Sequence, residues 1–286
     1  MLKEMRTPGE DMRPFRSEFV RHLAAAVVLF NLPLIAGAAP AATAGASTNA
    51  PPLRVVQWNI GHFAMGKSNS PRIRPQESDA RAEEYRAKIA ELNADFLGVS
   101  EFDPLFDTAG TSSVVKVFSS FPSFVAGPKR GFQSNAVFSK FPCVRHKVVN
   151  YAKRSQATYF LDSVYLIGGR EVHFVQTHLD WNSSEQAAKA RPEQIKQLVA
   201  HFADTPYVIV AGDFNVRKPE EYAPFIEAGW NLAHCGPGAE SLGTTRGKRP
   251  LDNIVAKGFR LSGVFLEDKD LLLSDHRIVG CVAEME

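Results

Sequence analysis

The sequence predicts an α/β protein of the α+β kind, in which two largely antiparallel β-sheets pack face to face and a few helices cover them. Two observations favour this class. Apolar, strand-like segments outnumber amphipathic helical ones, and several consecutive strands have no helix between them. A doubly wound parallel sheet requires a crossover helix after nearly every strand, so that architecture is disfavoured.

The first predicted elements are a buried strand at 53–60 (LRVVQWNI), an amphipathic helix at 78–94 and a second buried strand at 95–101. The helix is predicted because apolar side chains recur on one stripe with helical spacing. The residues on this stripe are Tyr85, Ile89 and Leu92. The strand at 95–101 (DFLGVSE) ends on a carboxylate.

Strands dominate the rest of the chain. They are predicted at 134–142, 143–151, 157–167, 171–179, 206–215, 251–258, 262–268 and 275–284. Gly168 and Gly169, followed by Arg170, indicate a short hairpin between two of these strands. A helical segment at 183–203 contains Pro192, which predicts two helices or a kinked one.

Residues 1–50 differ from the rest of the chain. Basic residues precede an apolar run at 23–39, and a tract of small residues follows it. This order is typical of a secretory signal peptide with a small-residue linker, and it predicts an exported protein, periplasmic or secreted. A membrane anchor formed by 23–39 is the alternative, although Asn31 and Pro33 interrupt the run and a spanning helix needs about 20 apolar residues. A true start at Met12 is a third possibility. Residues 51–286 then form one catalytic domain.

The charge and the cysteine content argue against a strongly basic DNA-binding protein and against a zinc motif. Without residues 1–50, which hold five Lys/Arg and four Asp/Glu, the chain keeps 28 basic and 27 acidic residues. A protein that binds duplex DNA mainly by neutralising phosphates usually has a strong basic excess, which this chain lacks. The three cysteines, Cys143, Cys235 and Cys281, match no zinc motif and allow one disulfide with a free thiol, or none. Burial is their expected role.

The chemistry is predicted at the ends of the strands, where Asn, Asp, Glu and His recur. A buried carboxylate is unfavourable unless it is paired or binds a cation, so several at one sheet edge indicate a metal site or a proton-transfer network. Each position alone is also consistent with a turn or a cap. The residues are Asn59, Glu101, His178, Asp213, Asn215, Asp252, Asp275 and His276.

These residue types suit the hydrolysis of a phosphate ester. A divalent cation offsets the negative charge of the transition state, and a magnesium-type ion prefers oxygen ligands such as those of Asn59, Glu101 and Asp275. His276, oriented by Asp252, is the predicted base for the attacking water. Three further residues complete the predicted site. Asp213 and Asn215 would orient water or a phosphate oxygen, and His178 would donate to a non-bridging oxygen.

The order WN…SE…THLD…GDFN…LDNI…SDH resembles the endonuclease/exonuclease/phosphatase superfamily, over about Leu53 to Ala283. Members of that superfamily include pancreatic deoxyribonuclease, exonuclease-III-type repair nucleases and neutral sphingomyelinases. The resemblance implies a four-layer sandwich, a Mg²⁺-type cofactor (with Mn²⁺ possible) and the roles given above. It also suggests a phosphate-binding role for Arg154, for which a plain solvent-exposed arginine is the alternative. The repair branch has an acid where this chain has Gly61, which argues against abasic-site repair.

The expected function is that of an exported, nuclease-like, metal-dependent phosphoesterase. A lipid or small-molecule phosphodiesterase or phosphatase is the alternative within this class. A non-catalytic secreted binding protein on the same fold is the alternative from another class. The expected partner is a phosphoester substrate, either nucleic acid or a phospholipid or small-molecule phosphate. No protein partner is expected, and the chain is expected to be a monomer.

Overall fold

The fold is that of a computed structural model, which describes residues 50–61, 79–102, 117–128, 130, 134–152, 158–268 and 272–286. All of them belong to one compact unit, Ser47–Glu286. Residues 1–49, which are nearly all of the predicted signal and linker (1–50), residues 62–78 and Arg154 lie outside the described residues. No helix among the described residues is long and apolar enough to span a bilayer.

The first sheet has the strand order β11-β12-β1-β2-β4-β3. Its strands are β1 (Leu53–Asn59), β2 (Phe96–Ser100), β3 (Ser123–Ala126), β4 (Asn135–Ser139), β11 (Phe259–Glu267) and β12 (Ile278–Met285). β1 and β2 are parallel, and the other described pairs in this sheet are antiparallel. The parallel pair brings the carboxyl ends of β1 and β2 to the same edge.

The second sheet has the strand order β5-β6-β7-β8-β10-β9. Its strands are β5 (Cys143–Asn150), β6 (Tyr159–Ile167), β7 (Arg170–His178), β8 (Val208–Asp213), β9 (Asn231–Leu232) and β10 (Asp252–Lys257). β7 and β8 are parallel, and their neighbours are antiparallel. Gly168 and Gly169 join β6 to β7 with φ values of 57° and 78°, as a two-residue hairpin with two left-handed residues requires.

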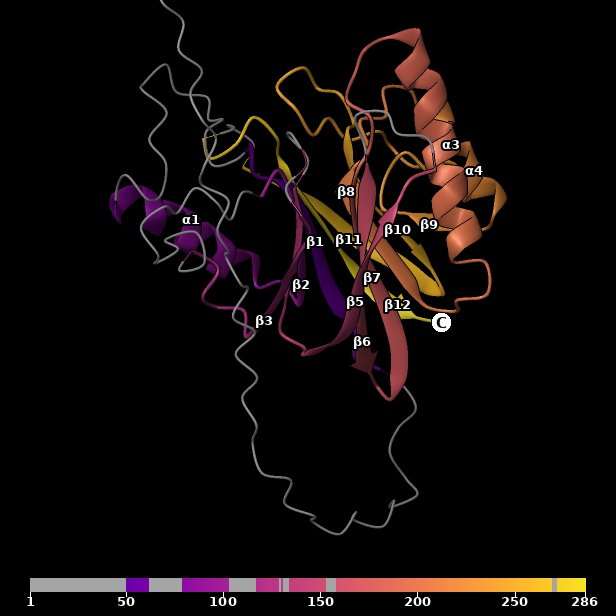
Figure 1. The fold of residues 1–286 in the computed structure, drawn as a ribbon. Helices are drawn as coiled ribbons and strands as arrows, with labels where there is room; N and C mark the ends of the chain where they lie inside the picture. The colour runs from indigo at the N-terminus through magenta and orange to yellow at the C-terminus, as the bar shows by residue number, and fades with distance from the viewer. Residues whose placement is uncertain are drawn as a thin grey trace, which may run out of the picture. The chain divides into compact units, whose positions relative to one another are not determined.

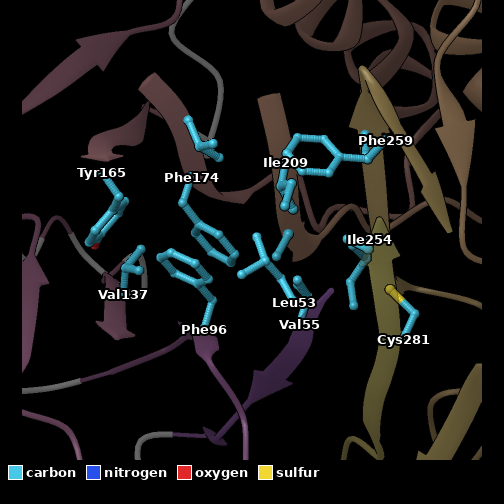
Figure 2. Close-up of a cluster of buried hydrophobic side chains, with 14 of the residues drawn as sticks. Leu53, Val55, Phe96, Val137, Tyr165, Phe174, Ile209, Ile254, Phe259 and Cys281 are labelled. Carbon is cyan, nitrogen blue, oxygen red and sulfur yellow. The ribbon is translucent and has the colours of Figure 1, made fainter. Parts of the chain in front are cut away.

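The two sheets pack against each other through a continuous apolar core. Figure 2 shows Leu53, Val55 and Phe96 of the first sheet facing Phe174 and Ile209 of the second. The rings of Phe96 and Phe174 stack with their centroids 4.9 Å apart. Alternate residues of each strand therefore face inwards, as sheet-on-sheet packing requires.

Helices cover the outer faces of both sheets. α1 (Asp79–Leu92) packs through Tyr85, Ile89 and Leu92 on the first sheet, which confirms the predicted stripe. α3 (Glu185–His201) and α4 (Ala223–Glu227) pack on the second sheet. In Figure 1, α1 lies to one side of the strands and α3 and α4 to the other. The result is a four-layer sandwich, and the predicted fold class is confirmed.

Three features differ from the sequence-based expectation or extend it. α3 is one helix that continues through Pro192, because it buries Ala187, Ile195 and Leu198 on both sides of the proline. The short strands β3 and β9 were not predicted, nor were the 3₁₀ helix η4 (Pro219–Tyr222) and α4. The three cysteines are free thiols, of which Cys235 and Cys281 are buried.

Candidate active site

Polar side chains from both sheets meet at one edge of the sandwich. Asn59 ends β1, Glu101 follows β2, and His178 and Asp213 end the parallel strands β7 and β8. In the strand register, His178 lies opposite Asp213, and Asp213 lies opposite Asp252 at the start of β10. The topology therefore brings residues that are far apart in sequence to one place.

The amide of Asn59 connects the two sheets. Its Nδ2 donates to Glu101 Oε1 at 3.1 Å and to Asp213 Oδ2 at 2.9 Å, and its Oδ1 accepts the Gly61 N–H at 3.0 Å. Asn59 is 1% exposed. A buried amide that is held at both ends fixes the positions of the carboxylates it contacts.

Two residues of this edge have left-handed backbone conformations. Glu101 has φ 56° and Asn215 has φ 51°. Asn tolerates this region, but Glu adopts it less readily, so the surrounding structure must hold Glu101 in place. Asn215 is fixed by its own N–H, which donates to Asp213 Oδ1 at 2.9 Å, and by its side chain, which donates to the Leu179 carbonyl at 3.3 Å. Such strain at a polar sheet edge is typical of a functional site.

Asp252 and His276 form a buried pair. His276 Nδ1 lies 2.7 Å from Asp252 Oδ2, and Asp252 is fully buried. Thr244 Oγ1 accepts the Asp252 N–H at 3.1 Å, and Ser274 Oγ accepts the His276 N–H at 3.1 Å. The Asp252 carboxylate thus orients the ring through Nδ1, and the two hydroxyl groups hold the backbone of both residues.

Negative charge makes this pair hold a proton tightly. Burial raises the pKa of the Asp252 carboxyl. Burial alone would lower the pKa of His276, but the carboxylates of Asp252, Asp213 and Asp275 outweigh it and raise that pKa to about 10. The pKa of Asp275 is raised by burial and further by Glu101 and Asp213. Without a cation, the pair therefore stays protonated at neutral pH.

Asp213 lies between two imidazoles. Its Oδ2 is 3.7 Å from His178 Nε2 and 3.9 Å from His276 Nε2. Asp213, Asp252 and His276 each place one potential ligand atom within 4.8 Å of the others. The arrangement can hold a proton on His276, and it can also attract a cation.

The donor set fits a hard divalent cation. Glu101, Asp213, Asp252 and Asp275 bring four carboxyl groups to one edge, and like charges so close together are unfavourable without a counter-ion. Glu101 and Asp275 are half-buried, so an ion can reach them from solvent. The Oδ1 of Asn59 keeps one lone pair beside its bond to Gly61. These oxygen donors are the type that Mg²⁺ and Mn²⁺ prefer.

The structure therefore gathers the eight predicted strand-end residues at one edge, while their individual roles remain predictions. The sequence analysis missed the polar network beneath them. Gln176 Nε2 donates to Gln57 Oε1 at 2.9 Å, and Gln57 Nε2 lies 3.4 Å from Asp252 Oδ1. A glutamine within an otherwise apolar strand is the signal that could have revealed Gln57. Nothing in the sequence marks Thr244.

Comparison with known proteins supports this reading of the fold. Residues 56–276 match the model of the endonuclease/exonuclease/phosphatase family. No curated protein sequence matches the chain.

Several experimental structures share the fold. An endonuclease/exonuclease/phosphatase protein from Beutenbergia cavernae is 17% identical, with a TM-score of 0.64 over 82% of this chain and 72% of the other. D. rerio TDP2 complexed with a single-strand DNA product is 16% identical, with a TM-score of 0.62 over 81% and 98%. The human nocturnin catalytic domain, with a bound sulfate anion, is 19% identical, with a TM-score of 0.61 over 83% and 96%.

Proposed function

The chain belongs to the endonuclease/exonuclease/phosphatase family and is a hydrolase of phosphate esters, and from this premise we propose that it cleaves phosphodiesters by attack of water on phosphorus. One observation carries the proposal. Asn59 ties Glu101 to Asp213, beside the buried pair of Asp252 and His276. Anionic oxygens that could bind a cation therefore lie next to an oriented imidazole that could take a proton.

A divalent cation bound by Glu101 and Asp275, with Asn59, would offset charge on the phosphoryl oxygens. We place it there because Asp252 and His276 already share a 2.7 Å hydrogen bond. Asp213 and Asn215 orient the attacking water, and His178 donates to a non-bridging oxygen. Offsetting the local negative charge also lowers the pKa of His276, so the imidazole can then take the proton from water.

We propose a nucleic acid as the substrate. The fold is shared with D. rerio TDP2, whose structure holds a single-strand DNA product. The second candidate is a lipid or small-molecule phosphodiester, because the near-neutral overall charge does not itself require a polyanion.

We also propose that the protein is exported. The support for this is residues 1–50, in which basic residues, an apolar run and small residues follow one another as in a signal peptide. Fractionation of cells that express the whole chain, with N-terminal sequencing of the product, tests it. A mature product that begins near residue 40 is expected. An uncut chain in the membrane fraction would favour an anchor at 23–39, and an uncut chain in the cytosol would overturn export.

The activity is tested with bis(4-nitrophenyl) phosphate, a small diester, in the presence of Mg²⁺ or Mn²⁺. Chelation should abolish turnover. Asp213→Ala and His276→Ala should each lower kcat by about 10²–10⁴, the usual contribution of a general base or its partner. His146→Ala is the matched control, because His146 is exposed on β5. Full activity in the Asp213 and His276 variants would overturn the assigned roles.

A further inference from the structure

Two loops beside the candidate active site are tied together by one buried ion pair. Arg191 of α3 is 1% exposed, and its Nε donates to Glu221 Oε2 at 2.6 Å. Its Nη1 donates to the carbonyls of Asp180 and Asn182 at 3.3 and 3.2 Å. Arg191 therefore holds the loop that follows His178.

The partner of this arginine holds the second loop. Glu221 Oε1 accepts the backbone N–H groups of Arg217 and Lys218 at 3.0 and 3.2 Å. These residues lie two and three positions after Asn215 in the chain. The buried pair thus fixes the segments that leave β7 and β8, on which His178, Asp213 and Asn215 lie.

The first loop presents an aromatic ring to solvent. Trp181 lies between the two carbonyls that Arg191 contacts, and it is 45% exposed. The other tryptophans, Trp58 and Trp230, are 0% and 5% exposed. An exposed indole on a fixed loop is a surface on which a planar group can stack.

The second loop carries cationic charge. The buried Nε of Arg217 has no hydrogen-bond partner among the described residues. Burial lowers the pKa of Arg217, and the nearby charges of Arg249 and Arg191 lower it further, against the smaller opposing effect of Glu221. Within the described part of the chain, no carboxylate forms an ion pair with Arg217 or Arg249. Positive charges gathered in this way favour an anion between them.

Arg249 belongs to a basic turn, Arg246–Gly247–Lys248–Arg249, which is exposed. The turn is anchored to the reaction centre. Thr244 Oγ1 accepts the N–H of Asp252, and Thr245 forms a β-bridge with His276. Arg249 N–H donates to Thr245 Oγ1 at 3.2 Å. The position of these charges relative to the Asp252–His276 pair is therefore fixed.

We propose that Trp181 and the basic group of Arg217, Arg246, Lys248 and Arg249 bind a single strand of nucleic acid beside the cleaved phosphate. This inference rests on the proposed function and narrows its substrate. A base must be unstacked to lie on a tryptophan, which a single strand allows and a duplex does not. The cations then bind flanking phosphates.

A membrane surface is the rival occupant, because Trp and basic residues also favour anionic bilayers. Its binding would need a contiguous apolar patch. Among the described residues, the large exposed apolar side chains outside this loop are Phe124, Val144, Leu166 and Leu272. Phe124 lies on β3 of the other sheet, and Leu166 on β6 lies opposite Glu171, at the other end of β7 from His178. Val144 lies at the start of β5, and Leu272, two residues before Ser274, is a single side chain. These four residues therefore form no contiguous apolar patch with Trp181. Nucleic acid is therefore favoured.

Binding is measured in EDTA, so that no hydrolysis is needed. A single-stranded oligonucleotide of about ten nucleotides is titrated while tryptophan fluorescence is followed. Quenching is expected, and Trp181→Phe should remove it, because the buried Trp58 and Trp230 contribute a constant signal. An abasic oligonucleotide of equal charge should bind without quenching. Quenching that persists in Trp181→Phe would overturn stacking on this residue.

Affinity is measured by fluorescence anisotropy. Trp181→Ala should weaken binding about tenfold, the usual effect of removing one stacked base. Arg249→Ala should reduce the slope of log K against log salt by about 0.7, as expected when one phosphate contact is lost on a single strand. Phe124→Ala, an exposed aromatic on β3, and Arg145→Ala, an exposed arginine on β5, should change neither value. Equal effects of the site and control variants would overturn the proposal.

Two further outcomes separate this inference from the proposed function. If wild-type protein cleaves the small diester but binds vesicles of phosphatidylserine and phosphatidylcholine instead of the oligonucleotide, the hydrolase stands and the nucleic-acid surface is wrong. If the oligonucleotide binds with Trp181 quenching but no diester is cleaved under any divalent cation, the surface stands and the proposed function fails.

Discussion

Arg191→Met removes the guanidinium that ties the Trp181 loop to the Arg217 loop and leaves a side chain of similar length. Glu221 is then a carboxylate with 11% side-chain exposure that has lost its ion-pair partner. Removing one partner of a buried ion pair destabilises a protein by about 3–5 kcal/mol. Glu221 keeps its two backbone N–H donors, which offset part of this loss, whereas two carbonyls lose their donor. We therefore expect a decrease of about 3–4 kcal/mol in the free energy of unfolding.

Urea denaturation followed by circular dichroism measures this change, and the melting temperature should fall by about 7–14 °C for a domain of this size. The double variant Arg191→Met/Glu221→Gln removes both charges and should recover most of the stability, to within about 1 kcal/mol of wild type. Trp181 quenching by the oligonucleotide, measured well below the melting temperature, should be lost in the single variant. The positioning role of the Arg191–Glu221 pair would be refuted if Arg191→Met lowered the free energy of unfolding by less than about 1 kcal/mol, or if it left the quenching of Trp181 unchanged.

Three further predictions concern other parts of the molecule. Burial lowers the pKa of His234 to about 4. The unfolded chain therefore binds a proton at His234 from about pH 6.5 downwards, while the folded chain stays unprotonated there until about pH 4. The free energy of unfolding therefore decreases as the pH falls through this range. The loss between pH 7 and pH 5 should be about 2 kcal/mol by urea denaturation, and it should be missing in His234→Gln. In Gly98→Ala the new Cβ would lie 2.0 Å from Gln176 Oε1, so we expect thermal denaturation to show a decrease of at least about 2 kcal/mol in the free energy of unfolding. Gly236→Ala is the control and should leave the free energy of unfolding nearly unchanged, because the nearest atom to its new Cβ is 3.6 Å away. Glu101→Gln should weaken Mn²⁺ binding in calorimetry by at least about tenfold, because it removes one anionic ligand, and unchanged affinity would place the ion elsewhere.

The two-sheet sandwich could be predicted because its central strands are long apolar runs. β8 is buried along its whole length, and it begins with the β-branched residues Val208, Ile209 and Val210. The edge strand β3 could not be predicted, because it has four residues of which only Val125 is buried, and β9 has two residues, neither of them buried. Pro192 predicted a break or kink from the loss of one backbone hydrogen bond, but burial of Ile195 and Leu198 keeps α3 in one piece.

The residues of the candidate site could be predicted from the sequence, but the contacts that position them could not. Polar residues at the ends of apolar strands are visible in the sequence, so Asp213 and His276 could be selected before their positions were known. The contacts that hold these residues in place could not be predicted. Arg191 and Glu221 are 30 positions apart, and their pairing depends on where α3 and η4 pack. Lone charged residues in helices are usually solvated, and nothing local distinguishes this pair.

The pairing of β1 with β12 has a consequence for the order in which the protein can fold. Leu53 lies opposite Ala283 and Val56 opposite Gly280, so the strand that opens the domain pairs with the one that closes it. During synthesis β1 therefore has an unpaired edge until β12 has been made, and such an edge is a template for aggregation. Contacts so distant in sequence also place the domain among slowly folding topologies. Asn59 reaches its final position only when β1 is held on both sides, so hydrolytic activity should appear only after β12 has paired with β1.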